Sequence, residues 1–177
     1  MNRVGIVVDL SHVGKKSAAD TIRKSKKPCA YTHICPSALF AHPRNKSDEQ
    51  LREISQAGGF VGVAAYAPFM RHGANSTLDD VIDLFEHVIN VCGEGSVGIG
   101  TDLTEDQDDA FFAWIRKDKG HGIQMVPAKG VAPTVHDFGS LADYPHLTHA
   151  MCRRGWSEQR IRSVLGENWL RFLGEVW

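Results

Sequence analysis

The sequence lacks any long hydrophobic run. Its longest apolar stretches, such as residues 60–67, fall far short of the roughly 20 residues that a membrane helix needs, and Met1 is followed by strand-like sequence rather than by a signal peptide. It also lacks an excess of charge, because 20 basic and 21 acidic residues are scattered along the chain. The sequence has no basic stripe with interleaved aromatic residues that could bind nucleic acid. We therefore expect no membrane segment in this chain and no nucleic-acid partner.

Cysteine pairs of the C-x-x-C type are absent as well. The four cysteines are Cys29, Cys35, Cys92 and Cys152. Cys29 and Cys92 lie among apolar residues, where buried free thiols are common. This favours a reducing compartment, and we expect a cytoplasmic location. If the chain is a piece of a longer protein, a signal peptide would lie in the missing N-terminal part.

What the sequence does contain is enough apolar material for one domain, which we take as residues 1–177. Of its 177 residues, 42% are hydrophobic and 23% charged, a composition typical of one globular core. Four short apolar runs predict strands that are buried on both faces, because they are nearly continuous rather than alternating. These runs cover residues 4–10, 29–32, 60–65 and 96–101.

Helical patterns separate the four runs. Ser47 is followed three residues later by Gln50, which is the signature of a capping box, and Gly58 stands where a helix would end. Strands that alternate with helices predict a parallel sheet with right-handed crossovers, either in an open doubly wound sheet or in a barrel. The expected helices cover residues 15–25, the segment from Ser47 to Gly58, and the segment from Ser76 or Thr77 to Gly93.

The last third of the chain changes character. Residues 106–137 show no clear period and predict a long insertion, and such a segment usually covers a functional site or contacts another chain. Further helices are expected at residues 146–154, at residues 157–165 between a Ser157 cap and Gly166, and from Asn168 onward.

Polar side chains follow three of the apolar runs. Asp9 and His12 come at the end of the first run, His33 after the second and Asp102 after the fourth. Because ligands bind at the carboxyl ends of parallel strands, we expect these side chains to lie close together. Two imidazoles would suit zinc, and a carboxylate nearby could accept a proton from a bound water.

Each of these residues has a simpler interpretation when it is taken alone. A histidine beside a strand end is more often a loop residue bonded to the backbone than a metal ligand. Asp9 could accept hydrogen bonds from loop amides or hold His12 in one tautomer, and Asp102 could cap a helix or a turn. His42 is a special case, because it stands two residues before Arg44 on a loop that could face the same edge of the sheet. The remaining histidines are interpreted as surface or packing residues.

Six elements of the sequence resemble the membrane (renal) dipeptidase family, in the same order and at similar spacing. Together they span nearly the whole chain except the insertion. They are Gly-Ile-Val-Val-Asp-Leu-Ser-His at 5–12, Tyr-Thr-His at 31–33, Pro-Arg-Asn at 43–45, Gly-Gly-Phe-Val-Gly at 58–62, Val-Gly-Ile-Gly-Thr-Asp at 97–102 and Leu-Gly-Glu-Asn-Trp-Leu-Arg at 165–171. This resemblance implies the C-terminal half of a (β/α)8 barrel, with four parallel strand-helix units and C-terminal helices, a site with two zinc ions, and a dipeptide-like small substrate.

The resemblance also implies roles for individual residues. His12 and His33 look like the two histidine ligands of one zinc ion. Arg44 looks like the residue that grips the substrate carboxylate, for which its planar fork is suited. Asp102 resembles the acidic residue that handles the substrate amino group or proton transfer, while Asp9 looks like structural support.

One element of the family pattern is missing. None of the nine histidines has an aspartate two residues later, so the ligands of the other zinc ion would belong to a half that this chain does not contain. The expected function is zinc-dependent hydrolysis of dipeptides or related small amides, with this chain supplying half of a dinuclear site and ligating at most one ion. The expected partner is the missing N-terminal half or a second copy. The alternatives are an inactive fragment and a non-catalytic ligand-binding α/β domain.

Overall fold

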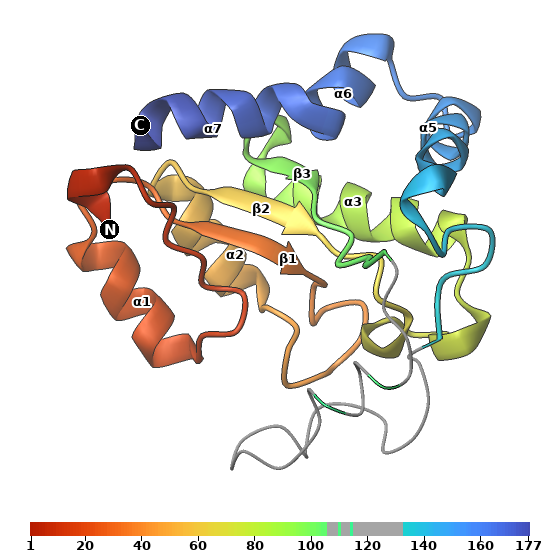
Figure 1. The fold of residues 1–177 in the computed structure, drawn as a ribbon, viewed down its shortest axis with the longest axis horizontal. Helices are drawn as coiled ribbons and strands as arrows, with labels where there is room; N and C mark the ends of the chain where they lie inside the picture. The colour runs from red at the N-terminus through yellow and green to blue at the C-terminus, as the bar shows by residue number, and fades with distance from the viewer. Residues whose placement is uncertain (106–109, 111–113, 115–132) are drawn as a thin grey trace.

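A parallel sheet forms the centre of the protein. The structure, a computed structural model, describes residues 1–105, 110, 114 and 133–177. Its sheet has three strands in the order β1-β2-β3, and both neighbouring pairs are parallel (Figure 1). The strands are β1 (Ala30–Ile34), β2 (Phe60–Val63) and β3 (Val97–Ile99). Parallel strands with helices between them confirm the predicted α/β class.

The predicted first strand, at residues 4–10, is wrong. Its beginning forms the short 3-10 helix η1 (Asn2–Val4), and its only pairing with the sheet is a bridge from Asp9 to Ala30. The segment lies at the edge of the sheet, and apart from this bridge it has no strand pairing within the described residues. Ile6 is accordingly 52% exposed, although its apolar surroundings in the sequence predict a buried strand.

The predicted helices are largely confirmed. Gly166, however, does not end a helix, because the π-helical segment η6 (Ser163–Glu167) carries the chain from α6 directly into α7. Asn168 explains this continuity, since its side-chain amide donates to the carbonyls of Glu94 at 2.6 Å and Val97 at 2.7 Å and anchors the turn to β3. The α-helices are α1 (Lys15–Lys24), α2 (Asp48–Gln56), α3 (Leu78–Cys92), α5 (Tyr144–Arg153), α6 (Glu158–Arg162) and α7 (Asn168–Val176). Short 3-10 turns lie at η2 (Ala67–Phe69), η3 (Gly73–Asn75), η4 (Glu94–Ser96) and η5 (Leu141–Asp143).

Capping side chains begin the two helices that follow β1 and β2. At α2 the Ser47 hydroxyl accepts from the Gln50 amide, and the Gln50 side chain accepts from the Ser47 amide at 3.2 Å. At α3 the Thr77 amide donates to the Asp80 carboxylate at 2.8 Å. Such caps stabilise a helix by about 1 kcal/mol each, so they fix where both helices start.

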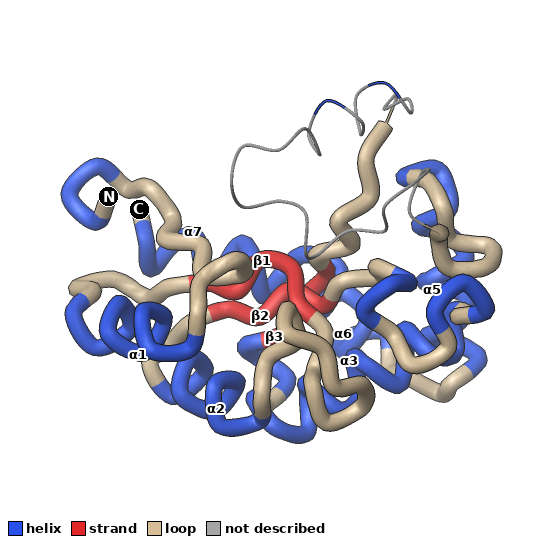
Figure 2. Tube along the Cα trace, turned by 90° about the horizontal axis from the view of Figure 1, so that it is seen from below, coloured by secondary structure: helices blue, strands red, loops and turns tan. Residues whose placement is uncertain are grey.

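The two faces of the sheet are covered by different helices. Val61 and Val63 of β2 point into the main core, where α2 and α3 pack. Phe60 points the opposite way, because successive side chains alternate along a strand, and its ring lies 4.8 Å from that of Trp169 and 5.8 Å from that of Phe172 in the C-terminal segment. Figures 1 and 2 show the resulting layers, with α1 and α2 on one side of the strands and α7 apart from them.

The predicted insertion at residues 106–137 lies mostly outside the described residues. Its last residues, 133–137, are described, and Val135 among them belongs to the core. Val135 forms a bridge with Phe138, and both side chains are fully buried. The His136 amide donates to the Ser76 carbonyl at 2.8 Å, which ties this segment to the start of α3.

Candidate metal centre at the strand ends

Two imidazoles meet at the carboxyl end of β1. His33 belongs to β1, and His12 lies on the loop after the bridged segment at Asp9. Their Nε2 atoms are 2.8 Å apart and their ring centroids 5.0 Å apart. Residues 21 positions apart in the sequence thus face one another through the nitrogen atoms that commonly bind metals.

The Asp9 carboxylate organises the backbone beneath these rings. Its Oδ1 atom accepts from the Ser11 amide at 3.0 Å, the Ser11 hydroxyl at 2.6 Å and the Thr32 amide at 3.1 Å. Partial burial would raise the pKa of Asp9, but the hydrogen bonds from Ser11 and Thr32 outweigh it and lower the pKa. Asp9 therefore stays ionised as an acceptor for neighbouring groups. It forms no hydrogen bond with His12, so the interpretation of Asp9 as a tautomer clamp on that ring finds no support.

Thr32 connects Asp9 to His33. The Thr32 hydroxyl donates to Asp9 Oδ2 at 2.7 Å and lies 2.8 Å from His33 Nδ1. Because the hydroxyl proton is used on the carboxylate, Thr32 accepts from Nδ1, and His33 then presents a lone pair at Nε2. An outer carboxylate that orients a histidine in this way is typical of metal sites. Sequence reasoning missed Ser11 and Thr32, although a hydroxyl residue directly precedes each of the two histidines.

Arg44 is buried next to the loop that carries His12. Its side chain is 6% exposed, and its Nη1 atom donates to the Ser11 carbonyl. The guanidinium also lies over the Phe69 ring at 5.6 Å. Burial lowers the pKa of Arg44, while the charges of Asp102 and Asp9 raise it. The contact with Ser11 uses one of the five N–H donors of the fork.

His42 supports Arg44 and does not join the pair of histidines. Its Nδ1 atom accepts from the Arg44 amide at 3.2 Å, and its ring packs 4.6 Å from that of Phe69. Burial lowers the pKa of His42, and the charge of Arg44 adds to this effect. The loop therefore does lie close to the predicted edge of the sheet.

Asp102 lies at the end of β3 in a left-handed backbone conformation, with φ of 62°. Aspartate tolerates this conformation better than most residues. Desolvation lowers the pKa of His12, as do the charges of Arg44 and His33, whereas the charge of Asp102 opposes them. The charge of the Asp102 carboxylate thus acts on both His12 and Arg44.

The remaining candidate ligands are placed elsewhere. His72 pairs with Asp80 and His87 with Asp48, each at 2.8 Å, and all four cysteines are free. Among the described residues, no group of three or more His, Cys, Asp or Glu side chains is arranged to hold a metal ion. No helix in the described part of the chain has the length and apolar character needed to cross a membrane.

Comparisons with known proteins match this arrangement. An amidohydrolase from Pseudomonas aeruginosa superimposes with a TM-score of 0.92 at 45% identity, over 100% of this chain and 54% of that chain. A metallo peptidase from Rhodobacter sphaeroides, solved with a phosphinate mimic of the dipeptide L-Ala-D-Ala, gives a TM-score of 0.80 at 27% identity, over 99% and 44%. Both similarities show that the chain has the fold of these two hydrolases.

The sequence comparisons are more specific. Residues 1–110 and 122–177 match the membrane dipeptidase family, peptidase family M19, and the chain belongs to that family. Dipeptidase tcpJ of Claviceps purpurea is 28% identical over 99% of this chain and 36% of its own length. An uncharacterized dipeptidase of Schizosaccharomyces pombe is 30% identical over 100% and 37%. The chain thus spans little more than a third of the length of these two relatives.

Proposed function

We propose that this chain supplies half of a dinuclear zinc site that hydrolyses dipeptides or related small amides. The observation that carries the proposal is the approach of His12 Nε2 and His33 Nε2 to 2.8 Å at the carboxyl ends of the strands. Ligands of one zinc ion each bond at roughly 2 Å, so their nitrogens must lie within roughly 4 Å of each other. The two imidazoles satisfy this condition, and zinc bound there would lower the pKa of a coordinated water.

The other residues of the site would bind and orient the substrate. Arg44 retains N–H donors beyond the one used on Ser11, and a guanidinium fork suits a carboxylate such as the C-terminus of a dipeptide. Asp102, on the neighbouring strand end, carries the charge needed to hold the substrate amino group or to accept a proton. We assign substrate binding to Arg44 and Asp102, and a catalytic role to Asp102.

The chain alone would bind zinc weakly. The described residues offer two imidazoles and no third ligand, whereas stable zinc sites use three or four protein ligands. We therefore propose that the remaining ligands come from the other half of a (β/α)8 barrel, contributed by an N-terminal half or by a second copy. The exposed edge at Val4 and Ile6 fits such a neighbour. Sedimentation should show self-association or aggregation, and a folded, cooperative monomer at tens of micromolar would contradict the half-barrel.

A zinc titration tests the metal site directly. We expect affinity in the micromolar range or weaker and little hydrolysis of dipeptides by the isolated chain, with zinc binding abolished in His12→Ala and His33→Ala. His136→Ala serves as the matched control, because His136 is an exposed histidine that pairs with its neighbour Asp137. Tight stoichiometric binding that survives both substitutions would show that the ligands are wrong.

The cytoplasmic location also remains a proposal. It rests on four free cysteines, two of them buried, because free thiols persist in reducing compartments. Fractionation of cells that express the native gene would test it.

A further inference from the structure

The residues on either side of His12, Ser11 and Val13, each have their carbonyl bound by a buried cation. On one side, Arg44 Nη1 donates to the Ser11 carbonyl. On the other, Lys46 Nζ donates to the Val13 carbonyl at 3.0 Å. Both cations are well shielded from solvent, with Arg44 6% and Lys46 5% exposed. The loop that carries His12 is therefore held by one buried cation before the histidine and by another after it.

The burial of Lys46 has an energetic cost. Desolvation lowers the pKa of its ammonium group to about 8, and the like charge of Arg44 adds to the lowering. Partial compensation comes from the Tyr31 ring, whose centroid lies 4.9 Å from Nζ. An apolar side chain could fill the same space without losing hydration. What only the ammonium group provides at this position is the hydrogen bond to the Val13 carbonyl.

The backbone of Lys46 is fixed to the segment that follows His33. Its amide donates to the Cys35 carbonyl at 3.0 Å, and its carbonyl accepts from the Ser37 amide at 2.8 Å. The side chain of Lys46 therefore joins the loop of one histidine to the strand end of the other.

We propose that Lys46 is a positioning residue that, together with Arg44, fixes the carbonyls of the residues before and after His12 and so directs its imidazole toward His33. The orientation of the ring follows from the structure alone, whereas its consequence for metal binding rests on the proposed function. The same contact would limit how far the two Nε2 atoms can separate.

The test compares Lys46→Met, which keeps the apolar stem and removes the ammonium group, with Lys46→Arg, which keeps a cation. Lys27→Met is the matched control, because Lys27 Nζ also donates to a backbone carbonyl, that of Glu175, at 2.8 Å, but in an exposed contact that lies before the start of β1, at the other end of the strand from His33. Two signals are followed, the ring nitrogen resonances of His12 and His33 without metal, and the affinity for zinc. The free energy of unfolding is measured for every variant.

We expect Lys46→Met to shift the ring resonances of His12 and to weaken zinc binding by about tenfold, the size seen when outer partners of metal ligands are removed. Lys46→Arg should recover most of both signals, and Lys27→Met should match the wild type. Unchanged resonances and affinity in Lys46→Met would overturn the inference. So would equal losses in Lys46→Met and Lys46→Arg that merely follow the loss of stability.

The design separates the two proposals. If zinc does not bind the wild-type chain through His12 and His33, the proposed function fails, while the metal-free resonances still decide the role of Lys46. If Lys46→Met does not fold, Lys46→Gln, which keeps an N–H donor without charge, takes its place and should give an intermediate shift of the His12 resonances.

Discussion

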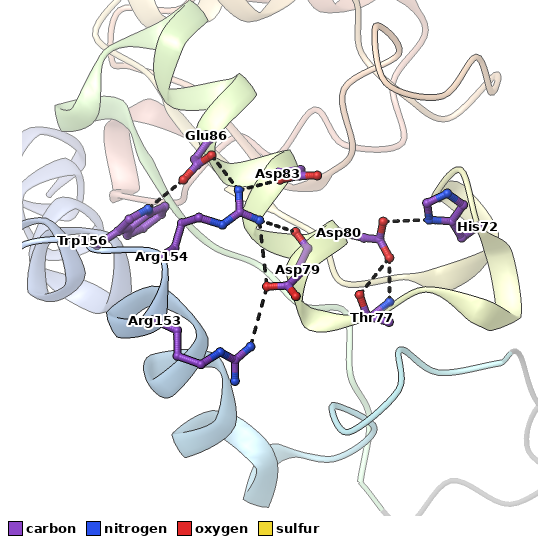
Figure 3. A network of polar contacts seen from close by, with 9 residues as sticks. All are labelled: His72, Thr77, Asp79, Asp80, Asp83, Glu86, Arg153, Arg154 and Trp156. Atoms are coloured by element: carbon purple, nitrogen blue, oxygen red, sulfur yellow. Dashed lines mark hydrogen bonds and ion pairs between the residues drawn. The ribbon is translucent and has the colours of Figure 1, made fainter.

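Two polar networks of this protein differ in how they are built. The strand-end network joins Asp9, Ser11, Thr32 and His33 through short side chains and backbone amides. The helix network holds α5 against α3 (Figure 3), and there long side chains meet near the surface. In that network Arg154 Nη1 lies 2.8 Å from Asp83 and 3.1 Å from Glu86, and the indole of Trp156 donates to Glu86 at 3.1 Å.

The two networks differ in how firmly they fix the positions of their atoms. Asp9 and Thr32 have few rotatable bonds, so their hydrogen bonds fix positions at little cost in conformational entropy. The acid side chains around Arg154 are partly solvated, with Asp83 56% and Asp79 65% exposed. Ion pairs of that kind contribute little to stability. We infer that the strand-end network fixes the positions of its atoms. The helix network holds α5 against α3 through contacts that can be removed at little cost in stability.

The largest effect that would test this comparison is expected at Asp9. Asp9→Asn keeps the shape of the side chain and removes a charged acceptor, so we expect a loss of about 2 kcal/mol in the free energy of unfolding and zinc binding weakened about tenfold. Denaturant unfolding and zinc titration measure the two effects. Asp83→Asn is the control from the helix network, and it should change neither by much. Equal effects of the two substitutions would contradict the inference that the two networks differ in how firmly they fix their atoms.

Much of the fold could be predicted because its signals are local. The Ser47 and Gln50 pair marks the start of α2 by a contact between neighbouring residues, and the structure forms that contact. The prediction of a first strand at 4–10 was wrong because pairing depends on distant residues, and within the described residues this run forms only the bridge from Asp9 to Ala30. The prediction that Gly166 ends a helix was wrong because the helix is continued by an anchor, Asn168. This residue binds Glu94 and Val97, which lie more than 70 residues away in the sequence.

The same division applies to the candidate site. The position of His12, His33 and Asp102 after apolar runs was enough to predict that they gather, because parallel strands end at one edge. Their support was not predictable in this way. From the sequence alone, Lys46 would be interpreted as a polar loop residue. Its burial against Val13 and Tyr31 depends on how the loop after β1 folds back.

A smaller effect is expected at the start of α3, where the network of Figure 3 includes a helix cap. Burial would raise the pKa of Asp80, but hydrogen bonds from Thr77 and His72 outweigh it and lower the pKa below the ordinary 3.8. A lowered pKa stabilises the folded state above the unfolded pKa, and this stabilisation is lost as the pH falls through the folded value. Asp80→Ala should therefore cost about 1 kcal/mol at neutral pH, and the difference should shrink toward zero in acid.

The measurement is a set of urea unfolding curves at several pH values. Asp79→Ala provides the matched control, because Asp79 is the neighbouring residue of the same helix, but its carboxylate lies 3.7 Å or more from its arginine partners and caps nothing. Its cost should be small at every pH. A penalty for Asp80→Ala that stays constant down to about pH 2 would show that the carboxylate charge does not act through the cap.

The smallest effect is expected at Arg154, the centre of the helix network. Arg154→Met keeps the length of the stem and its packing but removes the ion pairs with Asp83 and Glu86, so we expect a loss below about 1 kcal/mol at low salt. Salt screens partly exposed charges, and the difference should become smaller still in about 1 M sodium chloride. The Trp156 contact with Glu86 does not depend on Arg154 and should keep α5 docked. Lys16→Met, at an exposed lysine of α1, controls for the general effect of removing a positive charge. A loss above about 2 kcal/mol that persists in high salt would exceed what surface ion pairs provide, and it would mean that the helix network fixes the position of α5 as firmly as Asp9 fixes the strand ends.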